Sequence, residues 1–200
     1  MGAVRSLCPT SIMLSNGEID FVDETDQVIR NYINKYNFRT DGEYHVDCNS
    51  FDHSGSGEAR ILWAEIRNSN NDGVVDFHMD EEIVIQFGIK NPLHFNLDYA
   101  IEILDQNDYP LFHFWSSGED VQKTDNKNLI EQQIVKAIIP PLQLFPDHYY
   151  VNLWVGLNTR RVDKIEKCFR ITIKKDPKIK RDLLVTRGRF YQKASWKLFY

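Results

Sequence analysis

The sequence from Ala59 to Lys174 is a succession of short segments in which apolar and polar residues alternate, with turns between them. A period of two is typical of strands that bury one face. No helical period follows Tyr36, so the chain lacks the crossover helices that join parallel strands. The pattern therefore predicts an all-β fold, an antiparallel β-sandwich of the immunoglobulin or jelly-roll kind.

The clearest alternation lies in segment 82–90, where every second residue is a large apolar one. Pro140 and Pro141 end another segment, because proline has no N–H to donate to a strand ladder. The expected strands are 59–67, 82–90, 97–104, 111–115, 129–139, 149–157 and 168–174.

The segment His148–Leu157, HYYVNLWVGL, has two contrasting faces. Its odd-numbered residues from Tyr149 to Leu157 form an apolar core face. Its even-numbered residues are Tyr150, Asn152 and Trp154, and Gly156 leaves space beside the indole. A soluble antiparallel sheet more often carries Lys, Thr or Glu on its outer face. This row suits a ligand with flat apolar faces and many hydroxyls, such as a sugar, although a face covered by protein gives the same pattern.

Two other expected strands place aromatic and polar residues opposite their apolar sets. In segment 59–67 we assign Leu62, Ala64 and Ile66 to one face, and Ile61 to the other with the polar residues. In segment 111–115 the two phenylalanines take one face. Arginines are added to the candidate residues because a guanidinium can bind the carboxylate of an acidic sugar bidentately. The candidate carbohydrate-binding residues are Trp63, Glu65, Arg67, His113, Trp115, Tyr150, Asn152, Trp154, Arg160 and Arg161.

A large aromatic residue is often simply part of the core. That is the preferred interpretation for Trp63 and for Trp115 when each is considered alone. For Trp154 the neighbouring Tyr150 and Asn152 favour contact with a ligand.

The N-terminal segment predicts a hairpin over residues 11–22, since Asn16-Gly17 suits a tight turn with positive φ. A helix should follow, capped by Asp23 or Thr25. Its apolar stripe has little of its own segment to pack against, so we expect it to dock on a missing part or on a second copy. The stripe consists of Val28, Ile29, Tyr32, Ile33 and Tyr36.

The same segment, from Leu7 to Tyr32, resembles the end of an ABC-transporter ATPase domain. The matching residues are Leu7, Cys8, Ile12, Leu14, Gly17, Ile19, Val28, Ile29 and Tyr32. No GxxxxGK[ST] phosphate loop occurs in the sequence, so this chain alone should not bind or hydrolyse ATP.

The later segments follow one another in the order AEIRNSNNDG, EEIVIQFGIK, YAIEILDQNDYPLFHFWSS and IPPLQLFPDHYYVNLWVGL. This order resembles that of the C-terminal carbohydrate-binding domain of the ATPase subunit in ABC transporters that export O-antigen polysaccharide (Wzt-like proteins). One run matches at Ile139, Pro141, Leu142, Leu144, Pro146, Tyr149 and Val151, and the tail Arg187–Trp196 resembles the closing strand of that family. The resemblance implies that the chain binds the exported O-antigen, near its non-reducing end, without catalysis.

The resemblance also implies four parts. These are an ATPase remnant (1–38), a linker (39–58), the carbohydrate-binding sandwich (59–175), and a linker with a C-terminal strand (176–200) that could be exchanged in a homodimer. The missing ATPase domain would contact the transmembrane subunit, which places the protein in the cytoplasm at the inner membrane.

Composition argues against several other partners. The net charge of −5 and a pI near 5.7 do not favour nucleic acid. Three cysteines without CxxC spacing fit reduced thiols rather than a disulfide framework or a zinc site. His45 and His53 lack the spacing of a metal motif, and we expect neither metal nor cofactor.

Three alternatives remain open from the residues. A glycan-processing enzyme needs two carboxylates across a cleft, and no such pair is evident. A protein-interaction sandwich would use an edge strand. A calcium lectin could use clusters such as Asn68, Asn70 and Asp72, which turns explain more simply.

Overall fold

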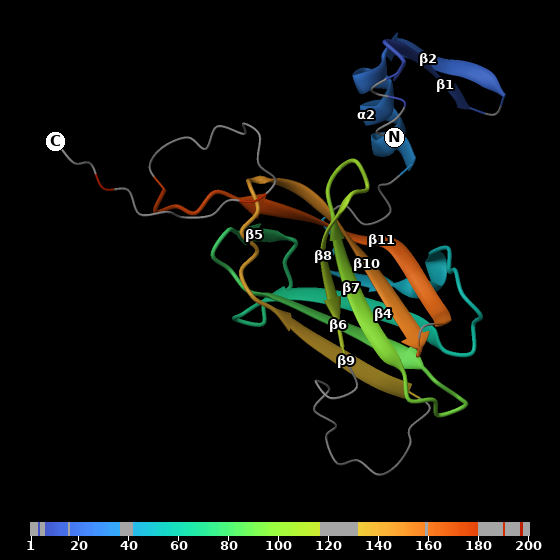
Figure 1. The fold of residues 1–200 in the computed structure, drawn as a ribbon, viewed down its shortest axis with the longest axis vertical. Helices are drawn as coiled ribbons and strands as arrows, with labels where there is room; N and C mark the ends of the chain where they lie inside the picture. The colour runs from blue at the N-terminus through green and yellow to red at the C-terminus, as the bar shows by residue number, and fades with distance from the viewer. Residues whose placement is uncertain are drawn as a thin grey trace.

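The computed structural model describes residues 4, 7–15, 17–36, 42–116, 132–158, 160–179, 190 and 197. Their strands form a two-stranded hairpin and two larger sheets of four and five strands. The two larger sheets lie face to face as two layers (Figure 1). The prediction of a β-sandwich preceded by a hairpin and an α-helix is confirmed.

The hairpin pairs β1 (Thr10–Ser15) with β2 (Glu18–Glu24) around Gly17, whose φ is +85°. Helix α2 (Thr25–Tyr36) follows and lies against β1, and the Thr25 hydroxyl donates to the Cys8 carbonyl at 2.5 Å. Val28 and Ile29 of α2 are buried, so the expectation that its stripe lacks a partner within the segment is wrong for these two residues. The hairpin still exposes Ile12, Leu14, Ile19 and Val22.

The five-stranded sheet has the order β5-β11-β10-β7-β8. Its strands are β5 (Asp76–His78), β7 (Asp98–Leu104), β8 (Pro110–Trp115), β10 (Asp147–Leu157) and β11 (Arg160–Lys174). All neighbours are antiparallel except β5, which pairs parallel with the end of β11.

The four-stranded sheet has the order β3-β4-β6-β9, and every pair is antiparallel. Its strands are β3 (His45–Asp47), β4 (Arg60–Asn68), β6 (Ile83–Lys90) and β9 (Gln132–Ile139), and a 3-10 turn η1 (Cys48–Ser50) follows β3.

Part of the expected linker belongs to the sandwich. β3 supplies an edge strand, and Val46 and Cys48 are buried. The following loop reaches the other sheet, where the Ser54 and Gly57 N–H groups donate to β11 carbonyls. Among the described residues, strand pairing within the sandwich therefore already includes His45–Asp47, ahead of the expected start near residue 59.

The core between the sheets is built from the apolar faces of the strands. Val151, Leu153 and Val155 are completely buried, as the alternation in β10 predicts. The assignment of faces in β4 is wrong at its start. A register shift between Ile61 and Trp63 places Ile61 in the core, while Leu62 is only half-buried.

The predicted closing strand lies almost entirely outside the described residues. Its residue Phe190 forms an isolated bridge with Leu144 of the same chain. The Phe190 ring also meets the Phe112 ring edge-on, with centroids 5.3 Å apart. Whether the tail is exchanged between two copies stays a prediction.

Candidate functional site

Two tryptophans share one cross-strand row on the outer face of the five-stranded sheet. Trp115 of β8 is in register with Ala100 of β7, and Ala100 is in register with Trp154 of β10. Two strand spacings separate the tryptophan backbones by roughly 10 Å. Ala100, which lies between the two tryptophans, has a small and buried side chain. Trp115 is 57% exposed and Trp154 is half-buried. We call Trp115, Ala100 and Trp154 the two-tryptophan face.

The Trp154 indole lies over Gly156, the next residue on the same face of β10. A Cβ at Gly156 would lie only 1.8 Å from Cη2 of the indole. Glycine at this position therefore lets the ring lie flat along the sheet, which confirms the role that the sequence predicts for Gly156.

Substitution of Gly156 by alanine should displace this ring and lower the free energy of unfolding by about 1–3 kcal/mol, the usual cost of overpacking. Chemical denaturation measures the change. In a Trp154→Leu background the same substitution should cost much less, because the obstructing ring is gone. An equal cost in both backgrounds would mean that the backbone, not the indole, requires glycine.

A polar row lies beside the two-tryptophan face. His113, Glu102 and Asn152 are in register on β8, β7 and β10. Glu102 Oε2 accepts from Asn152 Nδ2 at 2.9 Å and lies 3.3 Å from Lys164 Nζ, and Oε1 lies 3.5 Å from His113 Nδ1. Burial alone would raise the pKa of Glu102, but the hydrogen bond from Asn152 and the charge of Lys164 outweigh it and the pKa is lowered.

Asn152 has a structural task in this row. β11 makes a bulge opposite it, and Lys167 adopts a φ of +52° there. Asn152 Oδ1 accepts from the Lys167 backbone N–H at 2.8 Å, while Nδ2 is bonded to Glu102. Both ends of the buried amide are therefore engaged in holding the bulge against the sheet.

Tyr150 lies one row further along β10 and is also buried. Lys167 Nζ sits 5.1 Å from the centre of its ring and 2.7 Å from Asp108 Oδ1. This cation covers the tyrosine, so the more open rings of this sheet face are the two indoles. Contact of Tyr150 and Asn152 with a ligand stays a prediction.

A second aromatic group lies on the outer face of the other sheet. Trp63 of β4 stacks on His45 of β3, with centroids 5.9 Å apart, and its indole covers Gly88. Arg67 pairs with Glu65 at 2.9 Å and lies over the Tyr44 ring. The structure thus divides the candidate carbohydrate-binding residues between the outer faces of the two sheets. Contact of either group with a ligand stays a prediction.

The remaining predicted arginines lie where β10 turns into β11. Arg160 Nη1 lies 2.7 Å from Glu58 Oε1. Arg161 is in register with Gly156, and its guanidinium donates to the Ser54 hydroxyl at 3.4 Å. Arg161 is therefore close to the end of the two-tryptophan face, whereas Arg160 is tied to the loop before β4.

The residues of this face that sequence reasoning missed are Ala100, Glu102, Lys164 and Lys167. Alternation puts Ala100 and Glu102 on one face of their strand, but only the register brings them beside Trp154. The bulge that aims Lys167 at Tyr150 has no signature in the sequence.

Within the described residues, no group of three or more His, Cys, Asp or Glu side chains could hold a metal ion. Among those same residues, no helix is long and apolar enough to cross a membrane.

The fold is a β-sandwich, and the outer face of its five-stranded sheet places the two indoles beside fixed hydrogen-bonding groups. No family model and no curated protein matches the chain. Its fold is similar to the crystal structure of the C-terminal domain of wzt, with a TM-score of 0.58 and 12% sequence identity, over 75% of this chain and 89% of that one.

Proposed function

We propose that this chain is a non-catalytic carbohydrate-binding module and that the two-tryptophan face holds the glycan. The observation that carries the proposal is the row of Trp115, Ala100 and Trp154, with Glu102, His113 and Lys164 beside it. The C–H faces of a pyranose pack on indole rings, and its hydroxyls need donors and acceptors at fixed positions. This face offers both in neighbouring rows, which lie two residues, or about 7 Å, apart along the strands.

The glycan we propose is the O-antigen polysaccharide of the host cell, bound near its non-reducing end. The segment order resembles that of Wzt-like proteins, and the fold is similar to the C-terminal domain of wzt. In this proposal the N-terminal hairpin and helix continue an ATPase domain. That domain contacts the transmembrane subunit of an exporter, and the module works on the cytoplasmic side of the inner membrane.

The environment of Glu102 favours binding over hydrolysis. A glycosidase needs a general acid whose pKa is raised, together with a second carboxylate across the scissile bond. The pKa of Glu102 is lowered instead, and its oxygens are held by Asn152 and Lys164. Protein interaction is a second candidate function, because Ile134 and Ile138 are exposed on the edge strand β9.

Immobilised O-polysaccharide from the same strain should retain the purified chain, and unrelated glycans should not. Retention should persist in EDTA, since the proposed contacts are rings and hydrogen bonds. Equal retention on unrelated glycans would contradict specificity. Binding that is lost in EDTA and restored by calcium would support a calcium lectin, and release of oligosaccharide would support an enzyme.

We also propose that the chain is a homodimer in which the tail contact is exchanged. The Leu144–Phe190 bridge forms within one chain here, and the identical contact can form between two copies at little cost. Deletion of residues 188–200 should then give monomer or aggregate in light scattering. A monomeric intact chain at micromolar concentration would show that the tail closes its own sheet.

A further inference from the structure

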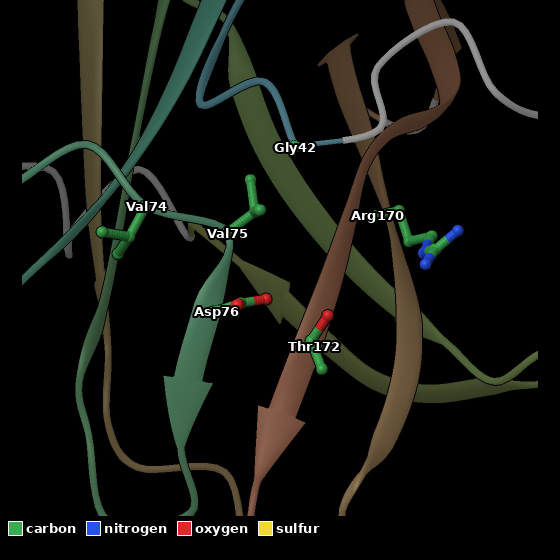
Figure 2. Close-up of a pocket in the computed structure, with 6 residues that line it drawn as sticks. All are labelled: Gly42, Val74, Val75, Asp76, Arg170 and Thr172. Carbon is green, nitrogen blue, oxygen red and sulfur yellow. The ribbon is translucent and has the colours of Figure 1, made fainter.

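A pocket opens on the side of the five-stranded sheet where β5 pairs with β11. It has a volume of about 410 Å³, within the range of small-molecule sites. Figure 2 shows Asp76 and Thr172 directed toward one another across the strand pair, with Val75 above them and Arg170 directed to the β10 side. The lining residues are Gly42, Val74, Val75, Asp76, Arg170 and Thr172.

This pocket belongs to the same sheet face as the two tryptophans. Arg170 is in register with Tyr150, and Thr172 is in register with both His148 and Asp76. Along β10, six residues separate Trp154 from His148, which corresponds to about 20 Å at the rise of a strand. One extended polymer lying along β10 can therefore reach both places.

The pocket combines three kinds of group. The hydrogen bond from Lys174, whose Nζ lies 2.7 Å from Asp76 Oδ2, holds the pKa of Asp76 below its usual range, so the side chain is a carboxylate that only accepts hydrogen bonds. Arg170 only donates hydrogen bonds. Val74 and Val75 add an apolar wall that packs against the core.

We propose that this pocket is a second sugar subsite that recognises an N-acyl substituent, such as the acetamido group of a hexosamine. The amide N–H would donate to Asp76, the amide carbonyl would accept from Arg170, and the methyl group would lie against Val75. A carboxylate on the sugar would be repelled by the Asp76 carboxylate. A hydroxyl in place of the acetamido group would make no apolar contact with the valines. The assignment rests on the proposed glycan-binding function and specifies one chemical group of that ligand.

Methyl NMR of the full chain tests the subsite without knowledge of the natural polysaccharide. N-acetylglucosamine, N-acetylgalactosamine and N-acetylmannosamine are titrated against glucose, galactose and mannose. At least one acetylated sugar should shift the Val74 and Val75 methyl signals with low-millimolar saturation, and its parent hexose should bind about tenfold more weakly, the value of one or two hydrogen bonds.

Two variants remove the recognising groups. Asp76→Ala and Arg170→Met, which keeps the aliphatic stem, should each abolish the preference for the acetylated sugar. Asp80→Ala is the matched control, because Asp80 also pairs with a lysine, Lys178 at 3.3 Å, but does not line the pocket. The control should keep the preference, and thermal unfolding verifies that all three variants fold.

The outcomes separate this inference from the proposed function. If the sugars shift the indole N–H signals of Trp115 and Trp154 but never the valine methyls, the subsite is wrong and glycan binding stands. If the valine methyls respond equally to hexose and acetylated sugar, the acetamido assignment is wrong. If neither region responds to any sugar, or to the O-polysaccharide itself, the proposed function fails.

Discussion

Replacement of Asp163 by alanine should lower the free energy of unfolding by about 2–6 kcal/mol, since two buried donors each lose their acceptor at a cost of about 1–3 kcal/mol. Asp163 lies on β11 and is buried. Its carboxylate is 2.8 Å from His53 Nδ1 and accepts from the Ile61 backbone N–H at 2.7 Å. It thereby ties the 53–57 loop and the start of β4 to β11. The alanine variant leaves both partners buried without their acceptor.

Chemical denaturation at neutral pH measures this loss. Glu166→Ala is a suitable control on the same strand, because Glu166 is exposed and its carboxylate pairs with Lys164 at 3.1 Å. The control should change stability by about 0.5 kcal/mol or less. An Asp163 variant that unfolds like the control would mean that the carboxylate does not hold the two sheets together.

The segment before β4 packs against β11, although its sequence predicts a linker. Gly55 and Gly57 in a polar stretch indicate a loop. In the structure, Gly55 has a φ of +146°, and a Cβ there would lie 2.4 Å from the Val162 carbonyl oxygen. Glycine is required because the loop backbone packs directly on β11. The sequence indicates a loop at this position. It does not show that the backbone of the loop packs against β11 and therefore needs glycine.

Strands and faces were predictable wherever alternation is regular. The β10 core face follows directly from the sequence, and so does the inward set of β6 from Ile83 to Ile89. Faces became unpredictable at bulges, since one extra residue reverses the side-chain direction. Ile61 shows this in β4, and Lys167 shows it in β11.

The composition of the candidate site was predictable only in part. Alternation selected Trp154 and Trp115 individually, but the pairing of β7 between β8 and β10 brings them into one row. Trp63 has the same local pattern and lies on the other sheet. Periodicity gives the face of a strand, whereas the sheet that receives the strand depends on long-range pairing.

Removal of both indoles, in the variant Trp115→Ala/Trp154→Ala, should abolish measurable glycan binding. By analogy with bases stacked on aromatic side chains, each ring contributes about 1–3 kcal/mol. If the two contributions add, the loss is about 2–6 kcal/mol, which is roughly 30-fold to more than 10,000-fold in affinity. Calorimetry or retention on immobilised O-polysaccharide measures the effect.

Stability must be separated from binding, because Trp154 is half-buried. Trp63→Ala is the matched control, since it removes a half-buried indole that also lies over a glycine, but on the opposite sheet. It should lower the unfolding free energy without weakening the glycan interaction. If Trp63→Ala removes binding and the double variant keeps it, the glycan lies on the four-stranded sheet, where Glu65 and Arg67 would supply its hydrogen bonds. The double variant must also keep a cooperative unfolding transition, because loss of binding in an unfolded chain would say nothing about the two-tryptophan face.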